Sequence, residues 1–138
     1  MTTTSYRSPR DAQGSGALHI LVVDDDCETQ TLVASSLATL GIVECCSDAY
    51  QALARVQAEP FDVIVLELLL PGASGADLIE RLVATGLNIP VVAVSAAGTE
   101  GVLADRVREA GATAVMEKPL DARLLAFNVV RATQWVNR

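Results

Sequence analysis

The residues that could carry chemistry in this sequence are polar side chains that come directly after short apolar runs. They are Asp24 and Asp25 after the run 20–23, Glu67 after 63–66, Ser95 after 91–94, and Lys118 just beyond 113–116. Carboxylate oxygens are ligands for a hard cation such as Mg²⁺, which usually keeps several waters. A lysine ammonium and a serine hydroxyl could hold the oxygens of a phosphoryl group. If these side chains converge, the sequence predicts a site for Mg²⁺ and a phosphoryl group.

The elements that would position these side chains are apolar runs that alternate with helical patterns. We expect strands at 20–23, 42–46, 62–67, 91–95 and 113–116. We expect helical patterns within 29–40, between 48 and 60, from 74 onward, between 99 and 111, and from 121 to 136. The strand 62–67 has four consecutive apolar residues, mostly β-branched, as expected of a strand buried on both faces. Such alternation predicts an α/β domain with a parallel sheet, right-handed crossovers and helices on both faces. Because the carboxyl ends of parallel strands share one edge, where open α/β sheets bind ligands, the polar residues should meet there.

The helix boundaries are indicated by capping residues and glycines. Four residues are candidate N-caps: Asp48 with Gln51 as a capping box, Ser74 with Asp77 as a weaker one, Thr99, and Asp121. Gly41 and Gly111 are placed to end the first and fourth helices. Pro71 and Gly72 predict a turn directly after the strand that carries Glu67.

The composition bounds the size and class of the protein. The chain has 138 residues, of which 51% are hydrophobic, so we expect one globular domain at 18–138 and a flexible polar tail at 1–17. The formal net charge is −7 and aromatic residues make up 4%, which argues against a nucleic-acid surface. Apolar runs are too short to cross a membrane, and the N-terminus lacks the apolar centre of a signal peptide, so we expect a cytoplasmic protein.

The cysteines and the histidine predict little chemistry by themselves. Cys27, Cys45 and Cys46 fit neither a disulfide framework nor a zinc motif, and small buried thiols are the simplest interpretation. Cys45 and Cys46 should point to opposite sides of a strand. The single histidine, His19, lies before the expected first strand and has no partner cluster in the sequence, so we assign it no role.

Each polar residue of the constellation also has an ordinary structural explanation. An acidic run after a strand is often only a helix N-terminus, where carboxylates favour the positive end of the helix dipole. A lone serine such as Ser95 is more often a cap or turn residue. All of these residues stand at the correct ends of alternating strands, however, and this coincidence favours a functional site.

The motifs occur in the order typical of one family. They are the segment 22–26 (VVDDD), the segment 62–67 (DVIVLE) with Pro71 and Gly75, the segment 94–96 (VSA) and the segment 118–120 (KPL). From about residue 18 to 136 the chain resembles a receiver domain of the bacterial two-component response regulators. The resemblance implies a flavodoxin-like (βα)5 fold with strand order 2-1-3-4-5.

The resemblance also implies a role for each site residue. Asp24 and Asp25, with the residue at 67, would bind Mg²⁺, and position 67 would accept a phosphoryl group from a histidine kinase. Ser95 and Lys118 would contact that phosphoryl group. The bond before Pro119 would be cis, as in the family.

Two residues depart from the family pattern. The acceptor position holds Glu67, where the family has Asp, and the extra methylene would place the carboxylate roughly where phosphoryl oxygens belong. Because Mg²⁺ needs a near-ideal octahedron and in-line transfer depends on positioning, ordinary phosphorylation is in doubt. Val115 stands where the family usually has the Tyr or Phe that turns inward on activation, and the stiff valine cannot move in that way.

Glu67 is compatible with three hypotheses. The domain could be a natural atypical receiver that works without phosphate, a substitution of Asp that mimics the phosphorylated state, or a receiver with slow residual phosphorylation. Val115 slightly favours the first. From another class, a small haloacid-dehalogenase-type phosphatase would use Asp24 and Asp26, but Glu28 stands where that family usually has Thr or Val. A flavodoxin is disfavoured because the acidic turn at 24–26 would repel a flavin phosphate.

We therefore expect a phosphorylation-independent or phosphomimetic receiver domain that acts through its surface and is not an enzyme. Its expected cofactor is Mg²⁺, held weakly or not at all beside Glu67. Its expected partners are a sensor histidine kinase or phosphotransfer protein, and a downstream protein or a second copy at the face formed by about 99–135. We further expect a Lys118–Glu67 ion pair to hold Ser95 and the following loop, with Gly98 and Gly101, in one conformation.

Overall fold

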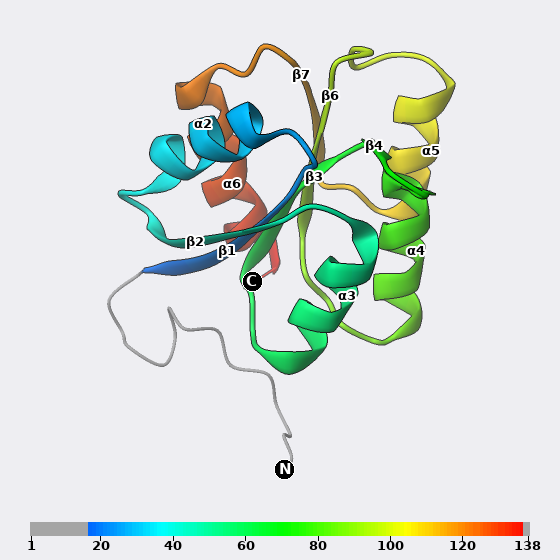
Figure 1. Cartoon of the computed structure of the whole chain (residues 1–138), viewed down its shortest axis with the longest axis horizontal. Helices are drawn as coiled ribbons and strands as arrows, with labels where there is room; N and C mark the ends of the chain where they lie inside the picture. The colour runs from blue at the N-terminus through cyan, green and yellow to red at the C-terminus, as the bar shows by residue number, and fades with distance from the viewer. Residues whose placement is uncertain (1–16, 137–138) are drawn as a thin grey trace.

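The computed structural model describes residues 17–136, so the expected tail lies almost wholly outside the described residues. Its central feature is a five-stranded parallel sheet in the order β2-β1-β3-β6-β7 (Figure 1). The strands are β1 (Leu18–Val23), β2 (Gly41–Cys46), β3 (Val63–Glu67), β6 (Val91–Ser95) and β7 (Ala114–Glu117). Counted along the chain, this is the order 2-1-3-4-5, and the expected flavodoxin-like fold is confirmed.

Four helices connect these strands, a fifth follows β7, and together they cover both faces of the sheet (Figure 1). They are α2 (Cys27–Leu37), α3 (Ala49–Ala58), α4 (Gly75–Ala84), α5 (Val102–Ala110) and α6 (Ala122–Val136). On one face α2 and α6 pack over a core that includes Val33, Leu125 and Val65. On the other face α3, α4 and α5 pack over a core that includes Leu78 and Ile64.

The central strand β3 is buried along its whole length, including Glu67 at its end. It pairs with β1 on one side and with β6 on the other. A strand enclosed on both faces and both edges explains its continuous apolar sequence. It also places Glu67 in the middle of the sheet edge where the strands end.

A short hairpin follows β3 and was expected only as a turn. It consists of β4 (Leu69–Leu70) and β5 (Ala73–Ser74), with Leu70 opposite Ala73. Gly72 in its turn has a φ of 75°, a conformation that favours glycine. Ser74 then caps α4 in a complete capping box with Asp77, which confirms the weaker of the two expected boxes.

The other predicted helix boundaries have mixed outcomes. Asp48 caps α3 as expected, but the Gln51 side chain accepts from the N–H of Ser47 and not from that of Asp48, so the expected capping box is not formed. Asp121 accepts hydrogen bonds from the N–H groups of Arg123 and Leu124 at the start of α6, as expected. Thr99 is not an N-cap: α5 begins after Gly101, with no side-chain cap. Gly111 ends α5 as expected.

The prediction for the first helix was wrong at its end. The helix α2 stops at Leu37, with Ala38 as its C-cap, before the chain reaches Gly41. Gly41 instead opens β2, where its backbone pairs with Leu18 of β1. Within residues 17–136, no helix has the length and apolar character needed to cross a membrane.

Candidate functional site

The candidate site lies at the edge where the carboxyl ends of the strands meet. The parallel register pairs Val23 with Leu66, Glu67 with Val94, and Ser95 with Glu117. Asp24 follows β1 and Lys118 follows β7, so the topology places both beside the end of β3. Glu67, Asp24 and Ser95 are all buried.

Lys118 connects two carboxylates of this edge. Its Nζ lies 2.6 Å from Glu67 Oε1 and 3.0 Å from Asp24 Oδ2. The expected Lys118–Glu67 ion pair is therefore confirmed, and Asp24 is a second partner. The side chains of Asp24 and Glu67 are 2% and 8% exposed, so the lysine compensates charges that water cannot reach.

The electrostatic environment keeps this lysine charged. Burial by itself disfavours the ammonium, but the hydrogen bonds to Glu67 and Asp24 outweigh that effect, and the pKa of Lys118 lies above its ordinary value. Lys118 is thus protonated throughout the neutral pH range.

The second oxygen of Glu67 is held by the backbone that follows it. The N–H of Leu69 donates to Glu67 Oε2 at 3.2 Å. The hairpin packs closely here, because Gly75 N donates to the carbonyl of Leu68 at 2.7 Å. A Cβ on Gly75 would lie 3.0 Å from the carbonyl oxygen of Glu67, which explains a glycine at this position. Both carboxylate oxygens of Glu67 are therefore engaged by the protein itself.

The three consecutive aspartates have different environments. Asp24 is buried, and its Oδ1 accepts a hydrogen bond of 2.9 Å from the N–H of Asp26. Asp26 is the N-cap of α2, and the hydroxyl of Thr29 donates to it at 2.7 Å, which lowers the pKa of Asp26. Asp25 is exposed and makes no hydrogen bond or ion pair within residues 17–136. Asp26 is thus occupied with capping the start of α2, which weakens the phosphatase hypothesis that needs it as a catalytic acid.

Ser95 is fully buried but its hydroxyl does not reach Glu67. Its Oγ accepts a hydrogen bond of 2.9 Å from the N–H of Ala97, which shapes the turn after β6. Its carbonyl accepts a hydrogen bond of 2.9 Å from the N–H of Lys118. Ser95 is therefore linked to Lys118 through the backbone, and Lys118 is linked to Glu67 through its side chain.

The residues of the edge do not fit a Mg²⁺ ion in this arrangement. The oxygens of Asp24 and Glu67 that face each other are bridged by the Lys118 ammonium. In the described part of the chain, Asp24, Asp25 and Glu67 do not bring three ligand oxygens within 4.8 Å of one another. A divalent cation would have to displace the lysine or draw Asp25 inward.

Two further expected positions lie near the site. Val115 is in β7, partly buried against the core beneath α3, α4 and α5. The Lys118–Pro119 peptide bond is cis. It directly follows the residue whose ammonium contacts Glu67.

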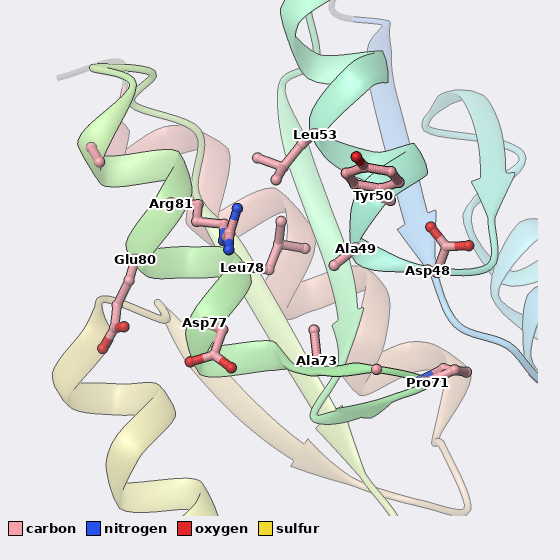
Figure 2. A pocket seen from close by; sticks show the side chains of 12 residues that line it. Asp48, Ala49, Tyr50, Leu53, Pro71, Ala73, Asp77, Leu78, Glu80 and Arg81 are labelled. Carbon is pink, nitrogen blue, oxygen red and sulfur yellow. The ribbon is translucent and has the colours of Figure 1, made fainter.

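A surface groove of about 820 Å³ lies between α3 and α4, and Pro71 and Ala73 of the hairpin after β3 line one end of it (Figure 2). Tyr50 and Leu53 of α3 line one side, and Leu78 and Arg81 of α4 line the other (Figure 2). This groove was not expected from the sequence, because grooves between helices depend on side-chain packing. The ion pair, and not this groove, marks the candidate site, because Asp24 and Glu67 at the strand edge are buried whereas Asp77, Glu80 and Arg81 of the groove are exposed.

Predictions for the cysteines and for the histidine need correction. Cys46 is buried, but Cys45 and Cys27 are exposed, so only one of the three thiols is the buried one expected. The contrast between exposed Cys45 and buried Cys46 is what adjacent residues on opposite sides of β2 would show, as expected. His19 lies within β1, and it has partners at the far end of the sheet that the sequence pattern did not reveal.

A family comparison agrees with the fold and the motifs. Residues 20–129 match the response regulator receiver domain, and the chain belongs to this family. The match favours the receiver interpretation over the phosphatase and flavodoxin alternatives. As a family, response regulators are partners of histidine kinases, and their receiver domains typically bind Mg²⁺.

Among curated relatives, the two-component response regulator PhoP of Pseudomonas aeruginosa is 35% identical over 118 residues, which are 80% of this chain and 51% of that protein. The protein-glutamate methylesterase/protein-glutamine glutaminase 5 of Myxococcus xanthus is 34% identical over 74% of this chain and 30% of that protein. The chain thus spans about half or less of the length of these relatives.

Solved structures show the same fold. NtrX from Brucella abortus in complex with ADP superimposes with a TM-score of 0.81 at 29% identity, over 88% of this chain and 28% of that one. The BeF3-activated DrrB receiver domain superimposes with a TM-score of 0.75 at 26% identity, over 88% of this chain and 99% of that one.

Proposed function

We propose that this receiver domain works as a protein-interaction module held in one conformation by the Glu67–Lys118 ion pair, and not as a phosphorylation switch. The proposal is carried by the 2.6 Å contact between Lys118 Nζ and Glu67 Oε1. We further propose that the domain has no conventional enzyme activity and that it is located in the cytoplasm, as is typical of the family.

Charge and space at the strand edge support this proposal. Glu67 reaches one methylene further than aspartate and meets the lysine without a phosphoryl group between them. An incoming phosphodonor would have to place more negative charge beside Asp24 and Glu67, and it would have to separate Lys118 from one of them. Breaking a buried ion pair is costly, so positioning for in-line transfer is poor. Mg²⁺ binding is weak for the same reason.

The link from the ion pair to the surface runs through Ser95. The N–H of Lys118 holds the Ser95 carbonyl, and the loop from Ala96 to Gly101 leads from there into α5. The face formed by about 99–135 carries exposed apolar side chains on α5 and α6, namely Val102, Leu124 and Phe127. We propose this face as the contact for a downstream protein or a second copy, with a histidine kinase or phosphotransfer protein as the upstream partner.

The test compares the wild-type protein with Glu67→Asp after incubation with acetyl phosphate and Mg²⁺. Intact-mass spectrometry should detect little or no phosphoryl adduct on the wild type and a clear adduct on Glu67→Asp. A Glu67→Asp/Lys118→Met protein serves as the control that retains the acceptor but lacks the lysine. Equal labelling of wild type and Glu67→Asp would refute the proposal.

A further inference from the structure

A second cluster of charged residues lies at the opposite end of the sheet from Glu67. His19 is near the start of β1, Glu44 is in β2, and Glu59 ends α3 as its C-cap. One ligand atom from each of these residues lies within 4.8 Å of the others. The strand direction separates this cluster from the receiver site, because His19 precedes Asp24 by the length of β1.

The two glutamates each divide their oxygens between the same two neighbours. Arg55 Nη2 pairs with Glu44 Oε1, and Arg55 Nε donates to Glu59 Oε2 at 3.2 Å. The remaining oxygens, Glu44 Oε2 and Glu59 Oε1, face Nε2 of His19, the latter at 3.6 Å. Arg55 therefore orients both carboxylates so that one oxygen of each is directed to the same ring nitrogen.

The imidazole is fixed with Nε2 toward these oxygens. Its Nδ1 lies 2.6 Å from the carbonyl oxygen of Pro60, and the ring stacks on Phe61 with centroids 4.2 Å apart. A carbonyl only accepts, so the Nδ1 position carries the proton. Nε2 then faces oxygens that also only accept, so a proton on Nε2, a hydrogen-bond donor or a cation must lie between them. The His19 side chain is 10% exposed, so the ring itself has little contact with bulk water.

A ring proton on Nε2 would satisfy only part of this arrangement. It can bond Glu44, but Glu59 Oε1 at 3.6 Å stays beyond hydrogen-bond distance, although Arg55 holds it in place. A metal ion is larger than a proton and accepts several ligands at once. Imidazole nitrogen together with carboxylate oxygen is a donor set that suits Zn²⁺ better than Mg²⁺ or Ca²⁺.

We propose that His19 Nε2, Glu44 and Glu59 form a binding site for Zn²⁺ or a similar divalent transition metal. Three protein ligands leave a fourth position for water. The Pro60 carbonyl on Nδ1 and Arg55 on the carboxylates supply the outer contacts that orient metal ligands. The side chains of Glu44 and Glu59 are 32% and 35% exposed, which gives the ion a path from solvent. Bound metal would tie β1, β2 and the end of α3 together.

His19 is the single histidine of the chain, so its NMR signals report on this site without assignment ambiguity. The experiment uses the full chain without an affinity tag, titrated with Zn²⁺ while the ¹⁵N signals of the imidazole are recorded. We expect saturation at one equivalent, with a large shift of Nε2 and a retained proton on Nδ1. The thermal unfolding midpoint should rise with Zn²⁺, because the ion binds the folded chain. Mg²⁺ at the same concentrations should leave both readouts unchanged.

Four variants separate this site from other ligands. Glu44→Gln and Glu59→Gln should each weaken Zn²⁺ binding about tenfold or more. Glu80→Gln on the exposed surface of α4 is the matched control, and it should bind as the wild type does. Cys27→Ser/Cys45→Ser removes the exposed thiols and should retain binding at His19.

The result that would overturn the proposal is an imidazole protonated at both nitrogens that stays so when Zn²⁺ is in excess, with an unchanged unfolding midpoint. A proton on Nε2, and not a metal ion, would then lie between His19 and Glu44. Zn²⁺ binding that disappears in the Cys27→Ser/Cys45→Ser protein would overturn it as well, since the thiols would be the ligands.

Discussion

The ammonium of Lys118 and the carboxylate of Glu67, 2.6 Å apart, connect two strands that are not neighbours in the sheet. Glu67 ends β3 and Lys118 follows β7, while β6 lies between them. The ion pair therefore crosses over the end of β6 at Ser95, whose carbonyl accepts the Lys118 N–H. One interaction thus fixes the relative positions of three strand ends.

Replacing Lys118 by methionine should destabilise the domain. The change leaves Glu67 and Asp24 buried without their cation, which costs about 3–5 kcal/mol for a fully buried pair. The Lys118 side chain is 19% exposed, so we expect about 2–3 kcal/mol. Urea unfolding should show a lower midpoint with an unchanged slope.

The control for this prediction removes both charges of the pair. Lys118→Met combined with Glu67→Gln should recover part of the lost stability, since fewer charges remain unpaired. If Lys118→Met alone is as stable as the wild type, solvent reaches this edge and the ion pair does not restrain it.

Replacing Gly75 by alanine should disturb the site through the backbone. The added Cβ would lie 3.0 Å from the Glu67 carbonyl oxygen and 3.1 Å from the Leu68 Cα, both backbone atoms. Overpacking of this kind costs about 1–3 kcal/mol, which outweighs the gain of up to about 1 kcal/mol from alanine in a helix. Urea unfolding measures the net loss. A stabilised Gly75→Ala protein would contradict the close packing of the hairpin against α4.

The thiol of Cys46 should be the least reactive of the three. Burial, aided by the charges of Asp48 and Cys45, raises the pKa of Cys46 to about 12. At mildly alkaline pH, iodoacetamide should therefore label Cys27 and Cys45 first, as peptide mass spectrometry can determine. Labelling of Cys46 as fast as Cys27 in the folded protein would contradict its burial.

The same thiol makes stability depend on pH in a defined direction. The unfolded chain releases this proton near the ordinary pKa of 9.0, and the folded chain releases it only at about 12. The contribution of the buried Cys46 thiol to the free energy of unfolding is therefore complete below pH 9 and is lost as the pH rises toward 12. Cys46→Ala should remove this part of the alkaline loss of stability, measured by urea unfolding across that range.

The alternation of elements and the position of the charged residues could be predicted because both follow from local patterns. The apolar run before Glu67 defines a buried parallel strand, and parallel strands share one edge, so the pairing of Glu67 with Lys118 followed from topology. Asp121 and Ser74 were recognised as caps because their side chains serve N–H groups two or three residues later.

The missed features depend on residues that are distant in sequence. His19 was assigned no role because Glu44, Arg55 and Glu59 come to it only through the pairing of β1 with β2 and the end of α3. Thr99 was a plausible cap by residue type, yet Gly101, with a φ of 105°, starts α5 instead. Asp24 was expected to face a metal, and its contact with Lys118 depends on how far a flexible lysine reaches.

The charge of Glu67, and not its size, should hold the turn after β6. Glu67→Gln keeps the shape of the side chain and removes the ion pair. Hydrogen exchange of the Lys118 and Ala97 amide protons, which bond to Ser95, should become faster in this variant. Unchanged exchange rates would mean that the ion pair does not restrain Ser95.

The most direct test of the central claim is an NMR comparison of the wild-type protein and Glu67→Asp, each with and without acetyl phosphate and Mg²⁺. The amide signals of residues 95–101 and of α5 report on the segment that leads from the ion pair to the interaction face. Our account predicts that the wild-type signals do not move with the phosphodonor, whereas those of Glu67→Asp do. Phosphodonor-dependent shifts of these signals in the wild type would contradict a domain held in one conformation by Glu67 and Lys118.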